Sequence, residues 1–215
     1  MFRFLLAAAA LLGGAQELTA APCVAASLAT YIGTSCTNFG VTFTAWTYTA
    51  GGTSITAADV TVFPSAAVPA FEFTVFTPGG WSAGAGITRT PSIGFTAESS
   101  SAATGSYVFL AFGTTSGTGT VAATLNECLG ALLAGGCLGT STALTVTPPT
   151  LFASNTFGAS FTPIDVRLSM TIIGGTGGAQ ISSIEAGLFA VPEPRTMSLM
   201  TLALGIIALR KRIRS

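Results

Sequence analysis

The segment Ile164–Ile172 (IDVRLSMTI) alternates strictly between apolar and polar residues, and this alternation restricts the fold more than any other feature of the chain. In an extended strand its five apolar side chains lie on one face, and Asp165, Arg167, Ser169 and Thr171 lie on the other. A period of two is typical of a half-buried β-strand, whereas a helix has a period of about 3.6 residues. The segment therefore predicts a strand with one face in an apolar core and the other in solvent.

Similar segments, each bounded by Gly, Pro or Ser, recur along the body of the chain at near-regular spacing. The expected strands are Val41–Thr49, Asp59–Phe63, Phe71–Phe76, Ile87–Thr96, Ser106–Gly113, Thr118–Leu125, Thr142–Thr147, Ile164–Ile172 and Gln180–Phe189. About eight to ten short strands indicate an all-β antiparallel β-sandwich, jelly-roll-like or immunoglobulin-like. The fifteen phenylalanines provide the side-chain volume that a core between two sheets needs.

Three local patterns refine this expectation. At Ala45-Trp46 the alternation changes parity, which predicts a β-bulge that redirects Trp46. The glycine-rich run Gly174–Gly178 predicts a turn that joins the last two strands in a hairpin. Leu125–Leu133 is the one plausible helix of the body, although Gly130 weakens it.

Charged residues make up only 7% of the chain, and histidine is absent. Between residues 21 and 190 the cations are Arg89 and Arg167, and the anions are Asp59, Glu72, Glu98, Glu127, Asp165 and Glu185. The body is therefore mildly acidic, which excludes a basic nucleic-acid-binding patch. Its length of about 170 residues suits one domain with a real core. No apolar stretch inside the body is long enough to span a membrane.

Four cysteines follow the N-terminal segment, and they permit three pairings. The favoured pairing is the sequence-local one, Cys23 with Cys36 and Cys128 with Cys137. A zinc site is not expected, because the chain has no CxxC spacing and no histidine. Closing such short loops contributes about 2–3 kcal/mol each in the chain-entropy model.

The N-terminus has the pattern of a secretory signal peptide. Arg3 supplies a positive charge, and Phe4–Gly14 forms an apolar segment of the expected length. Cleavage is expected after Ala20, which makes residues 1–20 the signal peptide. Cys23 does not follow a lipobox, so a lipoprotein is not expected.

The last twenty-five residues combine a rigid polar motif, an apolar segment and a basic cluster. The motif is Val191, Pro192, Glu193 and Pro194; the basic cluster is Arg210, Lys211, Arg212 and Arg214. Thr196–Leu209 carries no charge and predicts a short transmembrane helix of about 20 Å, against about 30 Å of bilayer hydrocarbon. By the positive-inside rule the basic cluster stays in the cytoplasm and the body lies outside.

This order of motif, apolar run and basic terminus resembles the PEP-CTERM protein-sorting signal of Gram-negative bacteria. The resemblance covers residues 191–215 and implies that exosortase, an integral-membrane cysteine protease, recognises and processes the chain. It also implies association with exopolysaccharide and the cell surface. The apolar run is shorter than the family's pattern and is short for a permanent anchor. The alternative is a plain tail-anchored periplasmic protein that is never cleaved.

The N-terminal part of the body is similar to the start of many PEP-CTERM proteins with uncharacterised ectodomains. The similar segments are Ala21–Cys23, Leu28–Ile32, Cys36 and Val41–Phe43. This resemblance implies a disulfide near the N-terminus and an all-β body. It implies no known activity and no ligand.

The sequence offers no catalytic, cofactor-binding or metal-binding constellation. Without histidine a Ser-His-Asp triad is not possible, and the single lysine, Lys211, lies in the basic tail. The run Gly174–Gly178 lacks the lysine of a phosphate-binding loop. The acidic residues are scattered singly and are expected to be solvated surface groups. We therefore expect a protein that is not an enzyme.

Two binding interpretations remain open. Trp46, Tyr48 and Trp81 are candidates for an aromatic platform that stacks on sugar rings, although burial in the core is the favoured interpretation. Alternating threonines suggest, more remotely, an ice-binding array; they are Thr42 and Thr44, and Thr145 and Thr147.

The sequence thus predicts an exported β-sandwich of residues 21–190 followed by a sorting segment of residues 191–215. The precursor is expected in the inner membrane with its body in the periplasm. Cleavage near Pro192–Pro194 is expected to deliver the body to the cell surface or extracellular matrix. The expected partners are exosortase, the membrane and exopolysaccharide.

Overall fold

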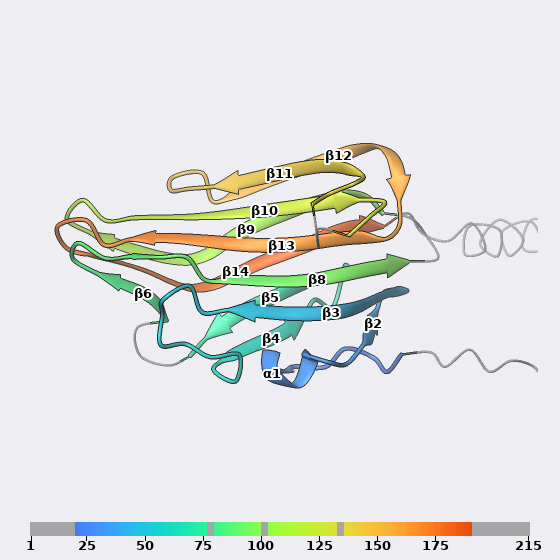
Figure 1. The fold of residues 1–215 in the computed structure, drawn as a ribbon, viewed down its shortest axis with the longest axis horizontal. Coiled ribbons are helices and arrows are strands. Elements are labelled where there is room, and N and C mark those ends of the chain that lie inside the picture. The colour runs from blue at the N-terminus through green and yellow to red at the C-terminus, as the bar shows by residue number, and fades with distance from the viewer. Residues whose placement is uncertain (1–19, 77–79, 100–102, 133–135, 191–215) are drawn as a thin grey trace, which may run out of the picture.

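The computed structural model of the chain describes residues 20–76, 80–99, 103–132 and 136–190. These residues form two antiparallel β-sheets, with the turns gathered at two ends (Figure 1). Sheet I has the order β1-β4-β5-β14-β9-β12, with β6 also paired to β14. Sheet II has the order β11-β10-β13-β8-β3-β2, with β7 also paired to β13. The predicted all-β antiparallel sandwich is therefore confirmed.

The strands of sheet I are β1 (Ala26–Ser27), β4 (Val60–Pro64), β5 (Ala70–Val75), β6 (Trp81–Gly84), β9 (Ala103–Ser116), β12 (Phe152–Phe161) and β14 (Gly178–Ala190). The strands of sheet II are β2 (Cys36–Asn38), β3 (Val41–Thr49), β7 (Thr88–Arg89), β8 (Ser92–Ser99), β10 (Thr120–Leu129), β11 (Thr140–Val146) and β13 (Ile164–Ile173). A single helical turn, α1 (Leu28–Tyr31), follows β1.

The prediction of a helix over Leu125–Leu133 is wrong, because β10 continues as a strand to Leu129. The inward side chains of β10 alternate through Leu125, Glu127 and Leu129, which are all buried. Pairing with β11 on one side and β13 on the other satisfies the backbone of β10 along this stretch. The sheet therefore overrides the weak helical pattern.

The predicted hairpin between the last two strands is also wrong, because β13 belongs to sheet II and β14 to sheet I. The glycine run crosses between the sheets at one end of the sandwich. A Cβ on Gly174 would lie 1.8 Å from the Gly84 carbonyl oxygen, and Gly175 has a φ of +55°. The Gly174 and Gly86 amides donate hydrogen bonds to the carbonyls of Ile87 and Gly175. Glycine is needed here because the crossing chain touches neighbouring backbone.

An aromatic cluster fills the core between β3, β5 and β8. The ring centroids of Phe43 and Phe71 are 4.6 Å apart at 87°, and those of Trp46 and Phe71 are 5.1 Å apart at 85°. Phe95 and Tyr31 complete the cluster. Edge-to-face packing of this kind stabilises the core beyond the area that it buries.

The predicted bulge in β3 is present. The register of β3 against β8 shifts between Thr44 and Thr47, and Ala45 adopts a φ of +51°. This extra residue turns Trp46 inward, where it is 2% exposed. A left-handed conformation is unfavourable for alanine, because its Cβ approaches the following carbonyl oxygen.

Replacing Ala45 with glycine should therefore raise the free energy of unfolding by about 0.5–1 kcal/mol, because glycine removes the Cβ penalty at positive φ. Urea denaturation measures the change. The control is Ala122→Gly in β10, a strand position where glycine should instead destabilise by about 0.5–1 kcal/mol. Equal destabilisation by both substitutions would contradict a strained Ala45.

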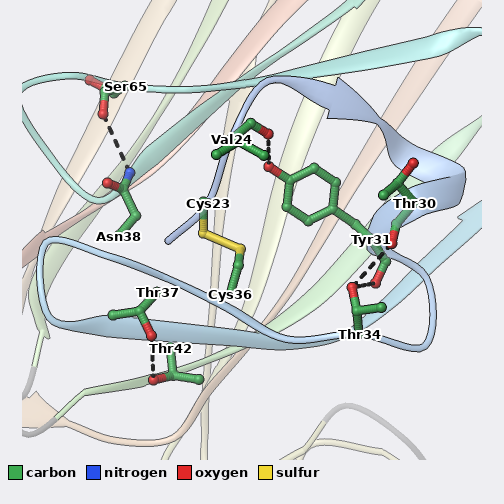
Figure 2. Close-up of a disulfide and its surroundings, with 10 residues drawn as sticks. All are labelled: Cys23, Val24, Thr30, Tyr31, Thr34, Cys36, Thr37, Asn38, Thr42 and Ser65. Carbon is green, nitrogen blue, oxygen red and sulfur yellow. Dashed lines mark hydrogen bonds between the residues drawn. A yellow bond between two sulfur atoms is a disulfide. The ribbon is translucent and has the colours of Figure 1, made fainter. Parts of the chain in front are cut away.

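Both predicted disulfides are present. Cys23 pairs with Cys36 and Cys128 with Cys137, with sequence separations of 13 and 9. The first bridge fastens the N-terminal segment to β2 (Figure 2). Beside it, the Tyr31 hydroxyl donates a hydrogen bond to the Val24 carbonyl. The second bridge fastens the loop after β10 to the end of that strand.

Candidate binding face

The outer face of sheet I brings two carboxylates together. Glu72 of β5 and Glu185 of β14 are direct register partners, and Thr74 and Ser183 are the next pair along the same strands. The intervening residue Phe73 points into the core, so the two glutamates face outward. Like charges directly opposite each other destabilise a sheet unless other groups compensate them.

Hydroxyl groups compensate both carboxylates. The Ser183 and Thr74 hydroxyls donate hydrogen bonds to Glu72 Oε1 at 2.5 Å and 3.2 Å. The Tyr107 hydroxyl of β9 donates to Glu185 Oε1 at 2.5 Å. No residue that the structure describes donates to Oε2 of either glutamate. Within the described residues, these hydrogen bonds of both carboxylates therefore end on a single oxygen, Oε1.

Burial of Tyr107 raises the pKa of its hydroxyl, and the hydrogen bond to the Glu185 carboxylate and that negative charge raise it further. The hydroxyl consequently keeps its proton and remains the donor of this hydrogen bond. Glu185 is thereby held in place as an acceptor.

Three aromatic rings lie beside the glutamates and form what we call the aromatic slab: Phe152, Tyr107 and Phe189. The Tyr107 ring lies 5.9 Å from Phe152 at an interplanar angle of 30°, and 5.5 Å from Phe189 at 29°. Gly187, the register partner of Tyr107 on β14, makes room for this ring, because a Cβ there would lie 2.6 Å from a ring carbon. Phe152 and Phe189 are 52% and 37% exposed. The slab therefore presents apolar surface to solvent.

Sheet I is also free of positive charge. In the described part of the chain the cations are Arg89 and Arg167, and both lie in sheet II, on β7 and β13. No strand of sheet I contains lysine or arginine. We call the combination of the slab with Glu72, Thr74, Ser183 and Glu185 the acidic–aromatic face. It accepts hydrogen bonds and disfavours anionic ligands.

The three aromatic residues that the sequence offered as a sugar platform do not form one. Trp46 is 2% exposed and Trp81 is fully buried. The Trp81 indole N–H donates to the Tyr48 hydroxyl at 3.0 Å, and this hydroxyl donates to the Ile55 carbonyl at 3.1 Å. Burial in the core, the favoured interpretation, is confirmed for both tryptophans. The exposed rings are phenylalanines, which sequence analysis did not select.

The threonines considered for an ice-binding array lie on sheet II or at its edge. Thr145 of β11 lies 3.1 Å from Thr124 of β10, hydroxyl to hydroxyl. Thr42 of β3 lies 3.4 Å from Thr37 of β2 in the same way. These hydroxyl pairs hold neighbouring strands together.

Glu127 does not have the surface position expected for the acidic residues. It faces the core from β10 and is 0% exposed. The Ser106 hydroxyl of β9 and the Thr142 hydroxyl of β11 each donate to Glu127 Oε2 at 2.8 Å, whereas Oε1 has no partner. Burial raises the pKa of this carboxyl, and the two hydroxyl donors partly counteract the rise. The strict alternation from Val121 onward is the signal that would have placed Glu127 inward.

Other predicted site residues lie outside the described part of the chain. These are the signal peptide, apart from Ala20, and the sorting segment with Val191–Pro194 and the basic cluster Arg210–Arg214. Among the residues that are described, no helix has the length and apolar character needed to cross a membrane. Within the same ranges, no three His, Cys, Asp or Glu side chains gather as metal ligands.

The fold and this face define an all-β, disulfide-bonded sandwich with an acidic–aromatic surface. No family model and no curated protein matches the sequence. Several solved structures are similar, among them the following three. TmCBM61 in complex with β-1,4-galactotriose shares 12% identity at a TM-score of 0.32, over 68% of this chain and 88% of that one.

A structure titled "CBM4 structure and function" shares 13% identity at a TM-score of 0.26, over 69% of this chain and 86% of that one. The enzymatically active domain of bacteriophage CBA120 tailspike protein 4 shares 16% identity at 0.29, over 67% of this chain and 19% of that one.

Proposed function

We propose that the chain is an exported, non-enzymatic protein that binds a neutral polysaccharide through its acidic–aromatic face. The observation that carries this proposal is the pair of exposed rings, Phe152 and Phe189, that pack against Tyr107 beside two carboxylates. A pyranose ring has an apolar face and a hydroxylated edge. Binding sites for such ligands combine apolar surface with a few well-placed polar groups.

The charge of the face limits the class of glycan. Carboxylate oxygens accept hydrogen bonds from sugar hydroxyls, and no cation on sheet I is present to pair with a uronate or sulfate. Polyanionic polysaccharides should therefore bind weakly. Weak binding of polyanions would distinguish this face from a surface that binds polymers through charge alone.

Binding is favoured over hydrolysis because the two glutamates have similar environments. In a glycoside hydrolase one carboxyl donates a proton and the other acts as nucleophile or base, so the two lie in different surroundings. Here each glutamate accepts hydroxyl hydrogen bonds at the surface of the same sheet. Nothing in this arrangement distinguishes a proton donor from a nucleophile.

Replacing Phe189 with alanine should weaken polysaccharide binding at least about tenfold, or about 1.4 kcal/mol. Glu185→Gln should also weaken it, because the amide replaces a charged acceptor. Affinity electrophoresis through gels that contain β-glucan, galactan, mannan or polyuronate measures the effect. The control is Phe39→Ala, which removes an equally large ring that is 53% exposed and lies between β2 and β3 of sheet II, away from the acidic–aromatic face. Equal retardation of all variants, or release of reducing sugars, would contradict the proposal.

We further propose that the C-terminal segment directs the chain to the cell surface through exosortase. The resemblance of residues 191–215 to the PEP-CTERM signal supports this route, as does the signal peptide pattern. The two disulfides also support it, because disulfides persist in oxidising compartments. β14 ends at Ala190, directly before the motif. The mass of the mature chain tests this route, as described in the Discussion.

A further inference from the structure

One end of the sandwich, which we call the tail end, is where the described chain both begins and finishes (Figure 1). Ala190, the last residue of β14, pairs with Ala103, the first residue of β9. The loop after β10 lies at the same end, because the Gly130 amide donates to the Pro163 carbonyl in the turn before β13. The turn between β2 and β3 also lies there (Figure 1).

Exposed apolar side chains project from the loops of the tail end. Leu138 is 94% exposed, Leu132 is 51% exposed, and Phe39 is 53% exposed. Phe39 also adopts a φ of +50°, which is unusual for a bulky side chain. The Cys128–Cys137 disulfide holds the chain directly before Leu138. An exposed leucine on a fastened loop and a strained, exposed phenylalanine are features that invite a functional explanation.

The described loops of the tail end carry no charge. They are residues 39–40, 65–69, 130–132, 136–139 and 162–163. The nearest charged residues on the adjoining strand ends are Glu98 of β8 and Asp165 of β13, both in sheet II. Transfer of these loops from water into an apolar environment therefore does not require the desolvation of a charged side chain.

The length of the connection to the apolar segment limits how far the tail end lies from a bilayer. Six residue steps separate Ala190 from Thr196, and an extended chain spans at most about 3.6 Å per residue. Insertion of Thr196–Leu209 would therefore hold the tail end within about 20 Å of the membrane surface. Apolar side chains at that distance gain free energy by entering the interface.

From this geometry we propose that the tail end docks on the lipid bilayer of the precursor through Phe39, Leu132 and Leu138. The inference rests on the proposed sorting route, because it needs the apolar segment to insert. Exposed apolar residues also occur at the far end, for example Phe112 and Ile173, so exposure alone does not select the membrane contact. The tail end is the expected membrane contact because the chain leaves it at Ala190 and continues to the apolar segment. Docking would place the Pro-Glu-Pro motif at the membrane edge.

The absence of lysine and arginine from these loops predicts binding that does not need anionic lipid. Contact with uncharged phosphatidylcholine is therefore expected, with little dependence on salt. This property makes a neutral vesicle the appropriate probe.

The test uses the full chain reconstituted into phosphatidylcholine vesicles that contain 6,7-dibromo lipid, which quenches tryptophan at the interface. Trp46 and Trp81 are buried and provide a constant background. Leu138→Trp places a reporter at the tail end. Phe112→Trp is the matched control, because Phe112 lies nine residue steps along β9 from Ala103, a distance of about 30 Å.

We expect the fluorescence of the tryptophan introduced by Leu138→Trp, above the background of Trp46 and Trp81, to fall at least twofold in brominated vesicles. The fluorescence of the tryptophan introduced by Phe112→Trp should not change. If both variants float with the vesicles and are quenched equally, insertion occurs without docking and the inference is overturned. If neither variant floats with the vesicles, the apolar segment does not insert, and both the sorting route and the docking proposal are wrong. Both substitutions are at exposed positions, so folding is not the limiting factor.

Discussion

Phe43→Ala should lower the free energy of unfolding by about 3–5 kcal/mol, the usual cost of removing a buried phenylalanine. Phe43 is 1% exposed, and its ring packs against Phe71, Phe95 and Trp46. The substitution leaves a cavity in the aromatic cluster that joins the two sheets. Such a loss is a large fraction of the stability of an ordinary domain.

Urea denaturation of wild type and variant measures this loss. Phe112→Ala is the matched control, because Phe112 is 67% exposed and its removal should change stability by less than about 0.5 kcal/mol. Similar changes for the two variants would mean that Phe43 is not a core residue.

The second large effect is a fall in stability as the pH rises, caused by Glu127. The pKa of this carboxyl is raised in the folded protein because the side chain is buried. The folded state therefore binds a proton more tightly than the unfolded state, where the pKa is about 4.3. The stabilisation from this proton is fully present below that value and is lost as the pH rises through the folded pKa.

Glu127→Gln should remove this pH dependence, because the amide stays neutral. The variant should be more stable than wild type at pH 9 and should have no advantage at pH 4, where Glu127 is neutral as well. Urea denaturation at both pH values measures the difference. Glu98→Gln, at an exposed position, is the control for the lost charge. Parallel pH profiles for wild type and Glu127→Gln would show that Glu127 ionises freely in the folded state.

Strict alternation and cysteine spacing predicted the parts of the fold that depend on local sequence. The strand at Ile164–Ile173, the bulge at Ala45 and both disulfides are as expected. The assignment of strands to sheets was not predictable. A turn such as Gly174–Gly177 joins strands equally well within one sheet or across two, and its backbone contacts decide the outcome.

Two further strand predictions were wrong for different reasons. β12 (Phe152–Phe161) was not predicted, because its Ser, Asn and Gly residues resemble a loop, and its pairing with β9 supplies the stability that its composition lacks. Ile87–Thr96 was expected as one strand but forms β7 and β8, separated by Thr90 and Pro91. Proline lacks the amide that a central strand must donate.

The candidate site was predictable only in its chemistry. Carboxylates and aromatic rings were evident from the sequence, but Glu72 and Glu185 are more than a hundred residues apart and meet only through the pairing of β5 with β14. Tyr107 and Phe189 likewise meet through the pairing of β9 with β14. The sequence suggested the two tryptophans as candidates for exposed rings. Both tryptophans are buried in the core, and the exposed rings are phenylalanines.

We propose that the chain is exported and then processed at its C-terminal segment. The intact mass of the mature protein from native cells, with and without exosortase, tests it most directly. We predict a chain that lacks residues 1–20 and the residues after the Pro-Glu-Pro motif, and that occurs only when exosortase is present. A chain that still ends at Ser215 in both strains would contradict the account and indicate a permanent tail anchor.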